Sequence, residues 1–195
     1  MNSTLRSVPA TSHVLLEGGV LAQVFWVIVF AAATAAGARF EIAHQPVPYT
    51  LQTLAVLLAG ALLGPRNGAM SQLLYLGAGT LGAPVFATGA FGPAVLFGPT
   101  GGYLLAFPAA AALVGFMTTY GKSLPWIVFS MVCGLLVIFT SGTLYLNAVA
   151  LHDLSAAFSS GFLLFSWWDL LKLATASAVY HQLARRWPRL PRDGQ

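Results

Sequence analysis

Two opposite charges, Asp169 and Lys172, lie three positions apart within the otherwise apolar stretch 161–187. Residues three apart on a helix share one face, so these two side chains can form an ion pair. Insertion scales assign a cost of roughly 2.5–3.5 kcal/mol to a lone Asp or Lys at the middle of a membrane helix. Such residues normally face the protein interior and mark a ligand or ion path. We therefore expect a binding site at this pair.

The pair offers the donors and acceptors that suit a neutral, urea-like ligand head. The N–H groups of the ligand can donate to the Asp169 carboxylate, and its carbonyl can accept from the Lys172 ammonium. Gln52, which has both a donor and an acceptor, is predicted to complete this cradle. Two alternatives stay open: a structural ion pair that only neutralises itself, and a Gln52 that serves helix packing.

The composition indicates a membrane protein that positions this pair inside a helical bundle. Of 195 residues, 57% are hydrophobic and only 7% are charged, which excludes a disordered chain and an ordinary soluble one. We predict one all-α integral membrane domain, residues 1–195, in contact with membrane lipid. Its six transmembrane helices are expected at about 19–38, 51–65, 69–83, 101–120, 124–149 and 161–186. The second and third are short for a bilayer of roughly 30 Å and need local thinning or burial among their neighbours.

The basic residues predict the orientation of the bundle. If both termini are cytoplasmic, only Arg39 lies on the outer side. The residues on the inner side are then Arg6, Arg66, Lys122, Arg185, Arg186, Arg189 and Arg192. The net charge of +4 thus reflects topology and not nucleic-acid binding. Asp169 lies about 12 Å below the outer end of the last span, so the site is expected to open outward.

Two outer connections are expected to cover the site. The first, 39–50, contains Pro46 and Pro48, which favour an extended loop that could act as a lid. The second, 82–102, is rich in glycine and has no charged residue, and its free amides could hold a polar or anionic group. Aromatic side chains are predicted to wall an apolar pocket, although aromatic residues near span ends can instead anchor the membrane interface. The residues predicted for this wall are Phe86, Phe91 and Tyr103.

Motifs of other function classes fail on context or spacing. The glycines of 77–82 match a dinucleotide pattern but lie inside a predicted span. The P-loop-like segment 115–123 has one intervening residue too many. We find no nucleophile with a base and no metal-ligand cluster, so we predict no enzyme activity, no cofactor and no metal site. An ion- or proton-coupled carrier of another small solute remains the alternative, with the Asp169–Lys172 pair as a relay.

The first predicted span carries small residues with the spacing that allows close helix contact. They can pack within the chain or form a docking face for another membrane subunit. The residues predicted for this docking face are Ala31, Ala32, Ala35 and Ala36.

Five blocks in consistent order, 46–60, 63–68, 81–86, 98–108 and 169–172, resemble the BioY family, the biotin-specific S-components of energy-coupling factor (ECF) transporters. The resemblance implies a six-helix S-component fold in the plasma (inner) membrane of a prokaryote. It implies biotin as the transported substrate, bound near the outer surface under the first and third loops, with Asp169 and Lys172 on the ureido ring. It also implies a partner ECF module of one coupling membrane subunit and two cytoplasmic ATPases, or a form that works alone.

The chain departs from this family in the glycine-rich connection. Members often carry a basic residue after the Pro-Val-Phe motif, where this sequence reads Ala-Thr-Gly-Ala-Phe-Gly over 87–92. We expect the biotin carboxylate to meet Thr88, loop amides or water, or to point toward solvent.

Overall fold

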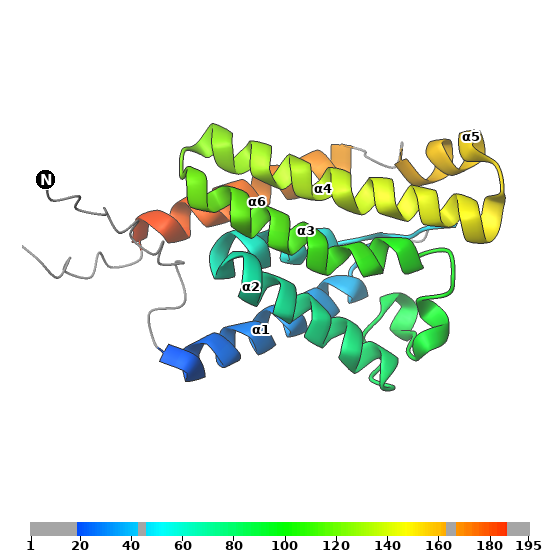
Figure 1. Cartoon of the computed structure of the whole chain (residues 1–195), viewed down its shortest axis with the longest axis horizontal. Helices are drawn as coiled ribbons and strands as arrows, with labels where there is room; N and C mark the ends of the chain where they lie inside the picture. The colour runs from blue at the N-terminus through cyan, green and yellow to red at the C-terminus, as the bar shows by residue number, and fades with distance from the viewer. Residues whose placement is uncertain (1–18, 43–45, 163–166, 187–195) are drawn as a thin grey trace, which may run out of the picture.

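Five long helices form the body of the protein in a computed structural model that describes residues 19–42, 46–162 and 167–186 (Figure 1). They are α1 (Gly19–Arg39), α2 (Gln52–Thr80), α3 (Gly101–Tyr120), α4 (Leu124–Leu146) and α6 (Trp167–Arg186). Helices that follow one another pack together, α1 on α2, α2 on α3 and α3 on α4, while α6 packs against α2 and α4. Buried apolar side chains such as Leu57, Val114 and Met131 fill the space between them.

Helix α2 is broken at Gly64 into two arms. Gly64 has φ +79° and ψ −179°, a conformation that is essentially restricted to glycine, and Pro65 follows it. The arms meet closely, since a Cβ on Gly68 would lie 2.9 Å from the Gly60 Cα. The predicted spans 51–65 and 69–83 correspond to these arms. The arms as observed, 52–63 and 65–80, are only about 18 and 24 Å long at 1.5 Å per residue.

Burial compensates for the short first arm. Each residue of 52–63 is buried or half-buried, as expected for a short span placed among neighbouring helices. Among the described residues, three segments are long and apolar enough to cross a membrane by themselves: Val20–Arg39, Gly101–Tyr120 and Leu124–Leu151. The two arms of α2 are too short for this, and α6 contains the charged pair, so these segments depend on their neighbours.

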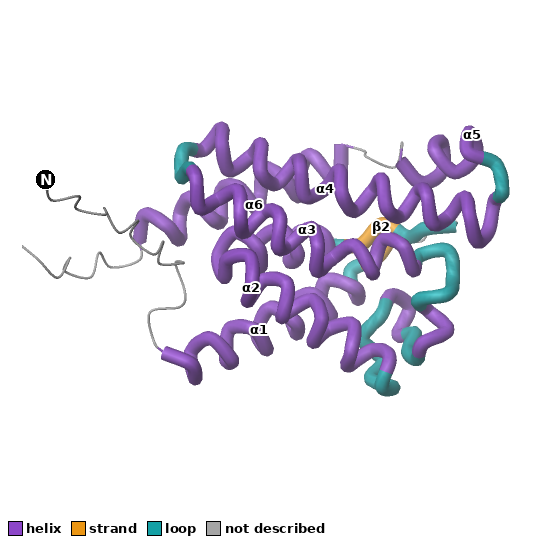
Figure 2. Tube along the Cα trace, viewed as in Figure 1, coloured by secondary structure: helices purple, strands orange, loops and turns teal. Residues whose placement is uncertain are grey.

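Short elements complete the end of the bundle that contains most of the loops (Figure 2). Strands β1 (Glu41–Ile42) and β2 (Tyr49–Thr50) form an antiparallel pair, with Glu41 opposite Thr50, so the predicted extended connection is a small hairpin. The 3-10 helices η1 (Ala87–Gly89) and η2 (Pro93–Val95) lie in the connection between α2 and α3. Helix α4 continues into the π-helix η3 (Asn147–Leu151), followed by α5 (Leu154–Ala157) and the π-helix η4 (Phe158–Phe162).

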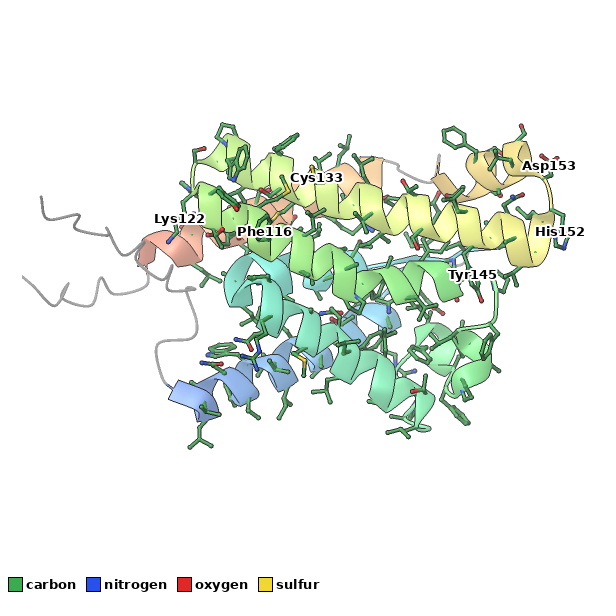
Figure 3. The ribbon with its side chains drawn as sticks, viewed as in Figure 1. Phe116, Lys122, Cys133, Tyr145, His152 and Asp153 are labelled. Atoms are coloured by element: carbon green, nitrogen blue, oxygen red, sulfur yellow. The ribbon has the colours of Figure 1, made fainter. Side chains whose placement is uncertain are left out.

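The two ends of the bundle differ in what they contain. Lys122 lies at one end, together with the start of α1 and the end of α6, whereas His152 and Asp153 lie at the other (Figure 3). The start of α1 and the end of α6 thus share one side of the bundle. The termini themselves lie outside the described residues, and their cytoplasmic location stays a prediction.

Candidate ligand-binding site

A cavity of about 250 Å³ lies under the hairpin and the loop that follows α2. Its volume is slightly below the roughly 300–1,000 Å³ of typical small-molecule sites, which suits a small ligand. The lining comes from the hairpin and its approach, the start of α2, the loop around η1, and α3, α4 and α6. The lining residues include Val47, Tyr49, Thr50, Gln52, Thr53, Phe86, Thr88, Thr100, Tyr103, Phe107, Phe139, Asp169 and Lys172.

The predicted ion pair is present and lies on the buried side of this cavity. The Lys172 Nζ is 2.6 Å from the Asp169 Oδ1, and both side chains are at most 5% exposed. Lys172 also donates to the Thr50 carbonyl at 3.1 Å and to the Thr53 hydroxyl at 3.0 Å. An ammonium has three N–H donors, so each has a partner here. A buried charge requires this kind of compensation.

Gln52 belongs to a chain of hydrogen bonds that starts at the side chain of Thr50, the residue whose backbone carbonyl accepts from Lys172. Its Oε1 accepts from the Thr50 hydroxyl at 2.9 Å, and its Nε2 donates to the Tyr75 hydroxyl at 2.6 Å. Tyr75, which is 1% exposed, donates in turn to the Val85 carbonyl at 3.4 Å. The side chain of Gln52 is thereby held at the cavity wall between the hairpin and the second arm of α2.

Aromatic rings form the apolar part of the wall. Phe86 is buried and lies edge-on to Tyr75, with ring centroids 5.5 Å apart. It packs against Gly79, where any Cβ would overlap its ring. Tyr103 is buried and edge-on to Phe139, with centroids 6.4 Å apart. The structure thus brings the predicted residues Phe86 and Tyr103 to the cavity.

Thr88 lies on the exposed side of the cavity, in a loop that is tied to the end of α1. Its φ of +56° is unusual for a residue with a side chain. Its backbone N–H donates to the Glu41 Oε2 at 2.9 Å, and the Arg39 guanidinium donates to the Pro84 carbonyl. These contacts hold the loop beside the hairpin at the mouth of the cavity.

Phe91 is not brought to this cavity. It is absent from the lining, and its side chain is 60% exposed. The reason is the turn at Gly92, which has φ +87° and donates its N–H to the Gly79 carbonyl at 2.8 Å. The prediction for Phe91 is therefore corrected: the turn fixes the end of the loop on α2 and leaves this ring outside.

The four alanines predicted as a docking face divide between two sides of α1. Ala31 is 8% exposed and belongs to the core, and Ala35 is half-buried against it. Ala32 and Ala36 are exposed. A period of 3.6 residues per turn places positions 31 and 35 on one face and 32 and 36 on the next. Ala31 thus packs inside the chain, whereas Ala32 and Ala36 are accessible, and the docking face itself stays a prediction.

Sequence reasoning missed several residues of the site, among them Thr50, Thr53, Tyr75, Phe107 and Phe139. Thr50 and Thr53 lie close to the predicted site residue Gln52 in the 46–60 block. Their proximity to Gln52 is the sequence signal that could have identified them. Tyr75 and the two phenylalanines are ordinary apolar-span residues, so nothing in their local sequence distinguishes them.

The helices and the cavity define a class: a multi-pass α-helical membrane protein with a binding site for a small solute near one end of the bundle. The chain belongs to the BioY family, whose model matches residues 6–189. It is 38% identical over 157 residues to the biotin transporter BioY of Thermotoga maritima, covering 80% of this chain and 92% of that protein. It is 40% identical over 161 residues to the probable biotin transporter BioY of Pyrococcus horikoshii, covering 83% and 95%.

A solved structure shows the same fold. The S-component for biotin from an ECF-type ABC transporter matches with a TM-score of 0.78 and 24% identity, over 85% of this chain and 92% of that one. The predicted family and the predicted S-component-like helical bundle are thereby confirmed. The relatives are named as transporters, in agreement with the prediction that the chain is not an enzyme.

Proposed function

We propose that this protein binds biotin and mediates its uptake across the plasma (inner) membrane of a prokaryote. The observation that carries the proposal is the buried Asp169–Lys172 pair in the wall of a small cavity. A ureido ring is neutral and offers N–H groups to the carboxylate and a carbonyl to the ammonium. The names of the BioY relatives support this ligand.

The contacts of Lys172 set a condition for binding. Because its three donors already meet Asp169, Thr50 and Thr53, the ligand carbonyl has to share or replace one of them. We infer that the Thr53 hydroxyl is replaced, since this side-chain oxygen only accepts from Lys172 and can rotate away, whereas the Thr50 carbonyl is fixed in the backbone. The rings of Phe86 and Tyr103 then face the apolar atoms of the ligand.

Uptake requires an outer opening and a source of energy. We place the mouth of the cavity, next to Arg39, on the outer side, as the distribution of basic residues predicts. Energy would come from an ECF module of one coupling membrane subunit and two cytoplasmic ATPases, docked at Ala32 and Ala36, unless the protein works alone. Support for this module comes from the fold shared with an S-component.

Calorimetric titration of the purified protein with biotin tests the proposal. Asp169→Asn and Lys172→Met are each expected to weaken biotin binding at least tenfold, about 1.4 kcal/mol. Asp153→Asn serves as the matched control, because Asp153 caps α5 at the exposed surface, where it accepts from Ser155 and Ala156. Unchanged affinity in both site variants would restore the alternative of a purely structural ion pair. A wild-type protein without affinity for biotin would refute the function itself.

A further inference from the structure

A cationic group, the Arg39 guanidinium, lies beside the mouth of the cavity, outside its lining residues and against the neighbour of the lining residue Thr88. The charged lining residues Asp169 and Lys172 compensate each other on the buried side, and the loop 87–92 has no charged residue. Arg39, at the end of α1, reaches across to this loop and donates to the Pro84 carbonyl. Its Nη1 lies 2.9 Å from the point that a Cβ on Gly89 would occupy.

Gly89 explains how the guanidinium can lie so close to the mouth. The residue has φ +77° and no side chain, and a side chain there would meet the guanidinium. Its neighbour Thr88 lines the cavity. Arg39 therefore lies over the loop, next to Thr88, which lines the exposed side of the cavity.

The guanidinium has donors available for an anion. It carries five N–H donors, of which the Pro84 carbonyl requires one. Glu41, the nearby acid, accepts from the Thr88 backbone. Within the described part of the chain, the recorded ion pair is Lys172–Asp169, so Glu41 and Arg39 form no direct ion pair.

We propose that Arg39 binds the carboxylate of the ligand at the mouth of the cavity and makes the site selective for a solute with an anionic tail. This inference rests on the proposed function, because it takes biotin as the ligand. The ureido ring would occupy the Asp169–Lys172 side, and the acid chain would run past Thr88 to the guanidinium. An arginine can hold a carboxylate with two parallel hydrogen bonds, which favours this anion over a neutral polar group.

The test compares biotin with its neutral primary amide by calorimetric titration of the full-length protein. Arg39→Gln should weaken binding of biotin on the order of fivefold, the upper end for a solvent-accessible ion pair, because an arginine can hold a carboxylate with two hydrogen bonds. It should change binding of the amide by less than about twofold. The affinity of Arg39→Lys for biotin should lie between those of the wild type and Arg39→Gln, because a lysine keeps the charge but not the planar fork. Arg66→Gln is the matched control, because it makes the same change at an exposed arginine beside the break in α2. It should leave the affinity for both ligands unchanged.

The outcomes separate this inference from the function on which it rests. An equal loss for biotin and its amide would show that Arg39 only holds the loop through Pro84, and would overturn the inference. If Arg39→Gln bound both compounds as the wild type does, the carboxylate would contact loop amides, water or solvent instead of Arg39. That result would also overturn the inference. Failure of the proposed function would appear differently, as a wild-type protein that binds neither compound.

Discussion

The Lys172 ammonium donates to the Thr50 carbonyl over 3.1 Å and so joins the last helix to strand β2 of the hairpin. The same ammonium reaches the Thr53 hydroxyl at 3.0 Å and the Asp169 carboxylate at 2.6 Å. One buried cation therefore holds together α6, the hairpin and the first arm of α2. A ligand that binds to Lys172 acts on these three elements together.

This arrangement predicts that the Thr53 hydroxyl stabilises the fold through Lys172. Thr53→Val keeps the shape of the side chain but leaves one ammonium N–H without its partner. Loss of a partner for a buried donor costs about 1–3 kcal/mol, so the free energy of unfolding in detergent should fall by that amount. Thr53→Ser keeps the hydroxyl and serves as the control.

A double-mutant cycle isolates the contact between Thr53 and Lys172. In the background of Asp169→Asn with Lys172→Met, both charges are gone, and Thr53→Val should cost less than about 0.5 kcal/mol. An equal cost in both backgrounds would mean that Thr53 stabilises α2 independently of the buried cation.

A second prediction concerns Gly79, whose lack of a side chain leaves room for the Phe86 ring in the cavity wall. The methyl group of Gly79→Ala would overlap that ring. The substitution should destabilise the protein by about 1–3 kcal/mol, as overpacking of a core does. Biotin binding should weaken with it, because the displaced ring lines the cavity.

Gly77→Ala is the matched control for Gly79→Ala. Gly77 lies on the same arm of α2, and a Cβ there has no neighbour within 4 Å among the described residues. Alanine in place of a helical glycine should stabilise the protein by roughly 0.5–1 kcal/mol. Thermal denaturation and titration with biotin measure both variants. If the two variants behaved alike, the packing of Phe86 on Gly79 would not shape the site.

The sequence predicted the charged centre of the site much better than its surroundings. Asp169 and Lys172 stand out because charges are rare in apolar spans, and their spacing sets a common face. Tyr75 carries no such signal: its contact with Gln52 depends on the approach of two arms that meet at Gly64. The direction of Phe91 depends on the backbone at Gly92, which the sequence does not specify.

The break in α2 gives a third prediction. At φ +79° and ψ −179°, Gly64 occupies a region that residues with a side chain essentially do not adopt. Gly64→Ala should therefore cost about 1–3 kcal/mol of stability, measured by thermal denaturation in detergent. The approach of α3 adds to the effect, because Gly115 packs directly on the Gly64–Pro65 backbone. Unchanged stability would indicate that the break can relax to another conformation without loss.

A fourth prediction separates binding from energised transport on α1. Ala32→Trp adds a bulky ring to the exposed face and should abolish ATP-driven uptake in cells or proteoliposomes with the ECF module, while biotin affinity stays within about twofold. Leu144→Trp, at a 56% exposed position of α4, is the control and should spare both. The buried neighbour gives a contrasting result: Ala31→Trp should lower stability, because this position is part of the core. Equal loss of affinity and uptake in Ala32→Trp would show that this face supports the fold and not a partner.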